Sequence, residues 1–195
     1  MSIYRLNIYM EGSLNLTGHI LAMPPQATDS VFARSVIVVA QHNAKGAWGL
    51  VVNKPNPRIT LDIVMLSAGI DYDNPETVYT GGPVENNRVH IIHSLDWRGL
   101  STISVAPDMG ITSDVSVLAA ISRGEGPKLY RTCIGIAAWA AGQLDGEFKG
   151  FPPWKQKNSW IDAPATIDAV FNLRADEQWE QAIDIIATSK VASWL

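Results

Sequence analysis

Residues 35–55 read SVIVVAQHNAKGAWGLVVNKP, and this stretch contains two runs of apolar and β-branched residues. The runs cover residues 35–41 and 48–53, and such runs are typical of buried strands. The HNAKGA segment between them contains Asn43 and Gly46, which both tolerate positive φ angles. We therefore predict a β-hairpin at the centre of the fold.

The second run ends abruptly in Asn53, Lys54 and Pro55. One interpretation is a turn, because Asn and Pro are common turn formers and Lys54 would then be solvated. The alternative is a binding site where a strand ends at a crevice. Another apolar run is followed by Gly81 and Gly82, whose backbone N–H groups suit either an anion or a tight turn. If these two strand ends meet, Lys54 and the glycine pair form an anion-binding cleft.

The composition is that of a packed globular protein, with 195 residues of which 47% are hydrophobic and 17% charged. These values exclude wholesale disorder. We predict one domain over residues 15–195, preceded by a loose tail over residues 1–14. The net charge is −4 and no window is a basic run. Direct binding to nucleic acid is therefore not expected.

The location in the cell follows from three sequence features. The first residues lack an uninterrupted apolar core behind a charged start, which does not fit a secretory signal. The apolar runs are too short to cross a bilayer, so no membrane association is expected. The single cysteine, Cys133, lies in an apolar run and is predicted to be buried and inert. We expect a cytoplasmic protein.

The rest of the chain alternates short strands with a few helices. Strands are predicted at residues 17–23, 77–80, 88–93, 101–106 and 129–137. Helices are predicted after a cap at Thr60, after a cap at Thr112 or Ser113, from about Ala141 through GQLDGEF, and over DEQWEQAIDIIA. Hairpins mixed with helices imply a mixed sheet and exclude a regular parallel βαβ array.

The side chains that could bind a ligand or take part in catalysis give few firm site predictions. His90 and His93 are three apart on a predicted strand, so their side chains point to opposite faces and do not grip one ion. His42 is interpreted as a surface or capping residue in preference to a general base. Gln143 shares a helix face with Glu147, and the pair suits either a ligand or a loop cap. We expect no metal site, no cofactor and no identifiable catalytic residue.

An ordered set of motifs gives a family resemblance. The set is LTGHILAMP, FARSVIVVAQHNAKGAWGLVVNKP, GGPV, ISVAPDMGITSD, RGEGP and AAWAAGQLDGEF. The chain resembles the YqgE/AlgH family of uncharacterised bacterial proteins from about Leu16 onward. The resemblance implies an α+β fold with a complex mixed sheet, bifurcated or partly barrel-like, surrounded by helices. The AlgH name carries a proposed role in transcriptional regulation of alginate synthesis, but the family has no recognised DNA-binding motif.

The sequence departs from the family pattern at three places. Val89 and His90 stand where the family usually has Gly-Phe after Arg88. Residues 40–42 read AQH where the family often has Cys-Glu-His. Because Ala40 replaces the cysteine, a redox role at this position is excluded in this chain. Residues 150–157, GFPPWKQK, are interpreted as an inserted surface loop. The pattern otherwise covers His42, Asn43, Gly46, Gly49, Asn53, Lys54, Pro55, Gly81, Gly82, Pro83, Arg88, His93, Ser113, Asp114, Trp139, Gly142, Gln143 and Leu144.

These observations favour a binding or regulatory protein that acts through a small ligand or a protein partner. The alternative is an enzyme acting on a small anionic or nucleotide-like substrate in the strand-end cleft. A transcriptional regulator that binds DNA directly comes third, because the charge opposes it. The candidate ligand-binding residues, expected to share one cleft, are His42, Asn53, Lys54, Gly81, Gly82 and Gln143.

Overall fold

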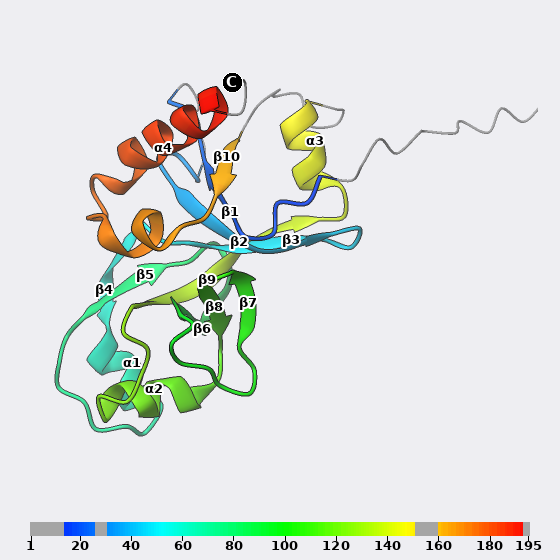
Figure 1. The fold of residues 1–195 in the computed structure, drawn as a ribbon. Coiled ribbons are helices and arrows are strands. Elements are labelled where there is room, and N and C mark those ends of the chain that lie inside the picture. The colour runs from blue at the N-terminus through cyan, green and yellow to red at the C-terminus, as the bar shows by residue number, and fades with distance from the viewer. Residues whose placement is uncertain (1–13, 26–30, 151–159, 193–195) are drawn as a thin grey trace, which may run out of the picture.

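The computed structural model describes residues 14–25, 31–150 and 160–192. The chain forms a curled sheet with helices at both ends, α3 and α4 above the sheet and α1 and α2 below it as drawn in Figure 1. The strands are β1 (His19–Ala22), β2 (Val36–Asn43), β3 (Gly46–Val51), β4 (Pro55–Thr60), β5 (Thr77–Thr80), β6 (Val84–Ser94), β7 (Ile103–Ala106), β8 (Met109–Thr112), β9 (Tyr130–Ala140) and β10 (Ile161–Pro164). The helices are α1 (Leu61–Ser67), α2 (Val115–Ser122), α3 (Gln143–Lys149), the π-helical turn η1 (Asp168–Asn172) and α4 (Gln178–Ala192).

Strand β9 is the branch point of the sheet. The main path runs β10-β1-β2-β3-β9-β6-β8-β7, and a side branch of β4 and β5 joins it at β9. The first part of β9 pairs in parallel with β5, and the last part pairs antiparallel with β3. This architecture confirms the predicted α+β class with a mixed, bifurcated sheet.

The predicted hairpin is confirmed as β2 and β3, with Asn43 opposite Gly46. Gly46 has the positive φ, 133°. Asn43 contributes differently from the expectation, because its Oδ1 accepts a hydrogen bond from the Lys45 N–H at 2.8 Å. Such an Asx turn is a second way in which Asn favours a tight connection.

Helix α2 begins one or two residues later than predicted. Its cap is Asp114, whose side chain accepts from the Ser116 N–H, whereas Thr112 and Ser113 were the expected caps. Thr112 Oγ1 instead accepts from the Asp114 N–H at 3.1 Å. Thr60 does precede α1, as predicted, but its side chain makes no capping hydrogen bond.

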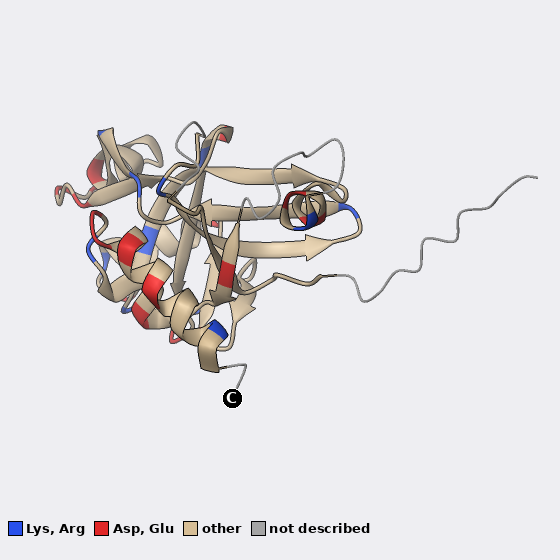
Figure 2. Ribbon diagram, turned by 90° about the horizontal axis from the view of Figure 1, so that it is seen from above, with Lys and Arg blue, Asp and Glu red and all other residues tan. Residues whose placement is uncertain are grey.

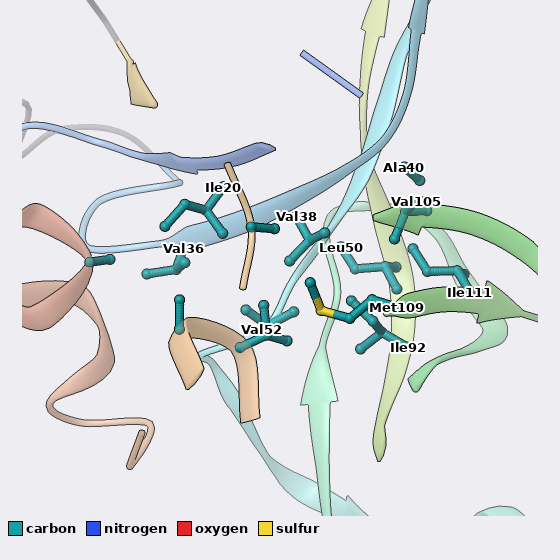
Figure 3. Packing of buried hydrophobic residues seen from close by; sticks show 14 of the residues in the cluster. Ile20, Val36, Val38, Ala40, Leu50, Val52, Ile92, Val105, Met109 and Ile111 are labelled. Atoms are coloured by element: carbon teal, nitrogen blue, oxygen red, sulfur yellow. The ribbon is translucent and has the colours of Figure 1, made fainter. Parts of the chain in front are cut away.

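The main core lies between the sheet and the carboxyl-terminal helices. Apolar side chains from β2, β3, β6 and β8 converge there, among them Val38, Leu50 and Met109 (Figure 3). Cys133 belongs to this cluster and is fully buried, as predicted, and burial raises the pKa of its thiol to about 12. Residues 151–157 of the loop predicted over 150–157, and residues 1–13 of the tail predicted over 1–14, lie outside the described residues.

Candidate functional site

His42 is buried, so its interpretation as a surface residue is wrong. Its Nδ1 accepts a hydrogen bond from the Leu16 N–H at 3.3 Å, and its Nε2 lies 3.0 Å from Asp145 Oδ2. Because Nδ1 acts as an acceptor, Nε2 carries the proton and donates to Asp145. Both ring nitrogens are therefore engaged within the protein, which agrees with the capping alternative.

Gln143 joins the end of β9 to α3. Its Oε1 accepts from the Ala140 N–H at 3.0 Å, and its Nε2 donates to Glu147 Oε1 at 2.9 Å. The other oxygen of Glu147 accepts from the Nε1 groups of Trp139 and Trp160, at 3.1 and 2.7 Å. The predicted shared helix face is confirmed, and the amide and the carboxylate hold the local structure together.

The side chains of Asn53 and Lys54 form hydrogen bonds with the backbone at the start of β2 and just before it. Asn53 Oδ1 accepts from the Val36 N–H at 2.8 Å, and its Nδ2 donates to the Arg34 carbonyl at 2.9 Å. Lys54 Nζ donates to the Ala33 carbonyl at 2.8 Å. Burial, and then the charge of Arg34, lower the pKa of Lys54. The polar residues that follow β3 therefore link the end of this strand to the start of β2, at the end of the hairpin away from its turn.

The glycine pair makes a close backbone crossing with β9. The Gly81 N–H donates to the Ile134 carbonyl at 2.8 Å, so this N–H does not face an anion. A Cβ atom on Gly82, which has a φ of 154°, would lie 2.1 Å from the carbonyl carbon of Ile136. Only glycine allows two backbones to approach this closely.

The six candidate residues do not share one cleft. The Thr80 N–H donates to the Lys54 carbonyl at 2.8 Å, so the two strand ends meet through their backbones. His42 and Gln143 lie at the other end of the hairpin, about 20 Å away at the usual rise of an extended strand. The ligand-binding role of these residues stays a prediction.

Replacing Lys54 by Met should lower the free energy of unfolding by about 1 to 2 kcal/mol, because the Ala33 carbonyl loses a charged donor in a half-buried place. Chemical denaturation measures this change. Lys45→Met is the matched control, since Lys45 is exposed in the hairpin turn and its loss should change stability by less than about 0.5 kcal/mol. Equal effects of the two substitutions would contradict the assigned contact.

A different place in the fold has the shape of a small-molecule site. A cavity of about 330 Å³, here called the His90 hollow, opens beside the first half of β6. Small-molecule sites typically have volumes of about 300 to 1,000 Å³. The hollow is lined by Trp48, Glu85, Arg88, His90, Ser101, Ile103, Ile111, Thr112, Ser113 and Ile136. Its walls thus combine an indole and three isoleucines with one cation, one carboxylate, three hydroxyls and an imidazole.

His90 is the least satisfied polar group in this hollow. The side chain is 8% exposed, and its buried Nε2 has no hydrogen-bond partner among the described residues. Glu85 Oε2 lies 3.8 Å from this nitrogen, which is too far for a hydrogen bond. Burial, and then Arg88, lower the pKa of His90, while Glu85 acts in the opposite direction. A neutral imidazole with an unpaired nitrogen costs the fold about 1 to 3 kcal/mol.

His93 provides a useful comparison. Its Nε2 is also buried without a partner among the described residues, and burial lowers its pKa. Its Nδ1, however, lies 2.9 Å from the Ser94 carbonyl, and its ring packs edge-on against Trp97 at 5.4 Å. His93 does not line the His90 hollow, so of these two histidines only His90 borders it.

A β-bulge in β6 carries Glu85 and Arg88, the two charged residues that line the hollow. The pairing of β6 with β9 shifts between Val84 and Val89, so residues 85–88 lie opposite Gly135 alone. Glu85 has a positive φ of 51°, which is rare for a residue with a side chain. Bulges re-aim side chains and occur often beside functional sites. Here Arg88 Nη1 lies 3.3 Å from Glu85 Oε2 at the edge of the hollow.

In the sequence, His90 suggests a metal ligand, and its spacing of three from His93 opposes that role. Two features of the sequence point to it: a histidine within an apolar strand, and a departure from the family pattern at that position. Arg88 and Ser113 were part of the family pattern, but nothing in the sequence showed that they lie together. Their meeting depends on the bulge in β6 and on the antiparallel pairing of β6 with β8, which Ser113 follows.

The wider surface offers little support for other classes of site. Figure 2 shows acidic and basic residues interspersed along the described ribbon, without one basic stripe. Over residues 14–25, 31–150 and 160–192, no three histidine, cysteine or acidic side chains are grouped so that they could hold a metal ion. No helix within these ranges has the length and apolar character needed to span a membrane.

Comparisons with known proteins agree with the fold and the motifs. The family model DUF179, described as AlgH-like, matches residues 20–189. A UPF0301 protein of Methylococcus capsulatus is 34% identical over 89% of this chain and 92% of its own length. A UPF0301 protein of Gluconobacter oxydans is 36% identical over 87% of this chain and 90% of its own length.

Two solved structures have a similar fold. The solution structure of the AlgH protein from Pseudomonas aeruginosa has a TM-score of 0.72 and 29% identity, and covers 90% of this chain and 92% of that one. A crystal structure of a Corynebacterium diphtheriae protein has a TM-score of 0.68 at 21% identity, with 88% of this chain and 87% of that one covered. The chain therefore belongs to the AlgH-like family of UPF0301 proteins, whose members have no characterised function.

Proposed function

We propose that this protein is a binding protein that holds a small organic ligand in the His90 hollow. The observation that carries the proposal is the buried Nε2 of His90, which has no hydrogen-bond partner among the described residues and belongs to a side chain lining a cavity of about 330 Å³. A ligand that offers this nitrogen a partner removes the cost of leaving it unpaired.

The composition of the hollow favours a small molecule. Ligand sites are mostly apolar, with a few convergent polar groups that fix the orientation of the ligand. Trp48 and the three isoleucines supply the apolar surface, and the Trp48 ring lies 5.9 Å from the His90 ring. Ser101 Oγ and Thr112 Oγ1 lie 3.0 Å apart and supply further hydrogen-bonding groups.

The proposal concerns this chain in particular. The family resemblance implies phenylalanine at the position of His90 in many relatives, and such relatives would lack the polar nitrogen. The site would then distinguish this protein from relatives that share its fold. The proposal does not involve DNA, because the net charge is −4 and the basic residues are dispersed.

His90→Phe tests this proposal, because phenylalanine keeps a ring of similar size and removes the unpaired nitrogen. We expect the variant to be as stable as the natural protein or up to about 1 kcal/mol more stable, and to lose ligand binding. The measurement is the thermal shift produced by a panel of small aromatic acids and their amides, since a ligand specific to the native state raises the melting temperature.

His93→Phe is the matched control, because it removes an equally buried imidazole outside the hollow. Compounds that stabilise the natural protein should also stabilise this control. The proposal fails if no compound of the panel shifts the natural protein, or if His90→Phe keeps the same shifts.

A further inference from the structure

We infer that the ligand of the His90 hollow is a flat aromatic molecule that carries a single carboxylate. The inference rests on the proposed function and adds to it the chemical class of the ligand. Three features of the lining support it: the flat apolar ring of Trp48, an arginine at the edge, and a glutamate that forms an ion pair with that arginine.

The flat wall is the ring of Trp48. The side chain is partly buried beside His90, and the two rings are tilted by 48°. The isoleucine side chains of β7, β8 and β9 at positions 103, 111 and 136 also line the hollow. An aromatic ring stacks on an indole with a favourable geometry that an aliphatic chain does not match.

Arg88 is the one cation among the described residues that line the hollow. Its side chain is 60% exposed, so its guanidinium is accessible to a ligand. A guanidinium presents its N–H donors as a planar fork that matches the two oxygens of a carboxylate. The position of Arg88 therefore favours an anionic group at the edge of the hollow, with the ring of the ligand further inside.

Glu85 shows what kind of anion fits. Its carboxylate lies 3.3 Å from Arg88 Nη1, so the protein itself places a carboxylate where we infer the ligand's carboxylate binds. An incoming carboxylate must displace Glu85, and the displaced charge stays nearby. The lining then holds one positive and one negative charge beside a neutral His90, which opposes a dianion such as a phosphate monoester more than a monoanion.

His90 lies beside the same carboxylate position. Its Nε2 is 3.8 Å from the Glu85 Oε2 that contacts Arg88. The neutral ring carries one N–H and one lone pair, so this nitrogen pairs with an oxygen of the ligand's carboxylate or with a polar ring atom next to it. The inferred ligand thus places its anionic group between Arg88 and His90.

Matched acid and amide probes test the class of ligand. The probes are 4-hydroxybenzoate, nicotinate and indole-3-acetate, each compared with its amide by calorimetric titration of the full chain. We expect at least one acid to bind about tenfold or more tightly than its amide, because the amide lacks the charge that Arg88 recognises. Arg88→Gln should abolish this preference, whereas Arg123→Gln, which changes an exposed arginine outside the hollow, should keep it.

Glu85→Gln distinguishes specific recognition of a carboxylate from non-specific binding of aromatic compounds in the hollow. Removing the internal competitor should raise the affinity for the acid severalfold and leave the affinity for the amide unchanged. Both Glu85 and Arg88 are exposed enough for their variants to fold, with side chains 41% and 60% exposed.

The possible failures are distinguishable. If acids and amides bind the natural protein equally well, or if Glu85→Gln does not strengthen the acid, the carboxylate inference is overturned and the proposed function stands. If neither acid nor amide binds, or if binding is indifferent to His90→Phe, the proposed function fails and this inference fails with it.

Discussion

Replacing Arg131 by Met is expected to lower the free energy of unfolding by about 3 kcal/mol or more. Arg131 is buried in β9. Its Nη1 donates to the Val52 carbonyl and to Gln178 Oε1, and its Nη2 donates to the Leu173 carbonyl at 2.9 Å. Its guanidinium also lies 4.8 Å from the centre of the Tyr79 ring. The substitution leaves several buried acceptors unpaired at once.

The contacts of Arg131 join the end of β3 to the carboxyl-terminal region, so the loss should appear in global unfolding monitored by urea titration. Arg123→Gln is the control, because Arg123 is exposed and its ion pair within the described part of the chain is with the exposed Glu125 at 2.8 Å. Its effect should stay within about 0.5 kcal/mol. A similar small effect at Arg131 would show that the buried cation does not hold these elements together.

Gly82→Ala is expected to cost at least about 3 kcal/mol or to prevent folding. The added Cβ would lie 2.1 Å from the Ile136 carbonyl carbon and 2.2 Å from the Ala137 nitrogen, and this backbone peptide cannot move aside as a flexible side chain would. The φ of 154° at this position adds strain for any residue with a side chain. The soluble yield and the urea midpoint of the variant measure the effect.

Gly124→Ala is the matched control for Gly82. Gly124 also has a positive φ, 72°, but a Cβ there meets nothing within 4 Å. Its cost should therefore be only that of the backbone conformation, about 1 kcal/mol. If both alanine variants lose the same stability, close packing at the branch of the sheet is not what requires glycine at position 82.

The elements that were predictable from the sequence are those fixed by local chemistry. The hairpin of β2 and β3 follows from two apolar runs and a turn sequence, and α1 and α2 follow from their apolar spacing after a polar residue, although Thr60 makes no capping hydrogen bond and the cap of α2 is Asp114. Strands β4, β8 and β10 were not predicted. Each is short and contains Pro or Gly, and each is a strand because of its partner. For β10 that partner is β1, where His19 pairs with Pro164.

The site was less predictable than the fold, because it depends on which distant side chains meet. The polar ending at Asn53 and Lys54 was correctly recognised as unusual, yet the groups it contacts, Val36, Arg34 and Ala33, are known only from the folded chain. The His90 hollow likewise depends on the bulge in β6. A sequence pattern does not reveal a shifted register, so Glu85, Arg88 and His90 gave no joint signal before the structure was known.

The nitrogen NMR signals of the histidine rings test the central claim most directly. The natural protein is titrated with 4-hydroxybenzoate, and the His90 signals are assigned by their absence in His90→Phe. We predict that Nε2 of His90 gains a hydrogen bond and shifts as the probe saturates, while the signals of His93, which is buried outside the hollow, stay in place. Saturation without any change at His90, or equal shifts at His90 and His93, would contradict a ligand site in the His90 hollow.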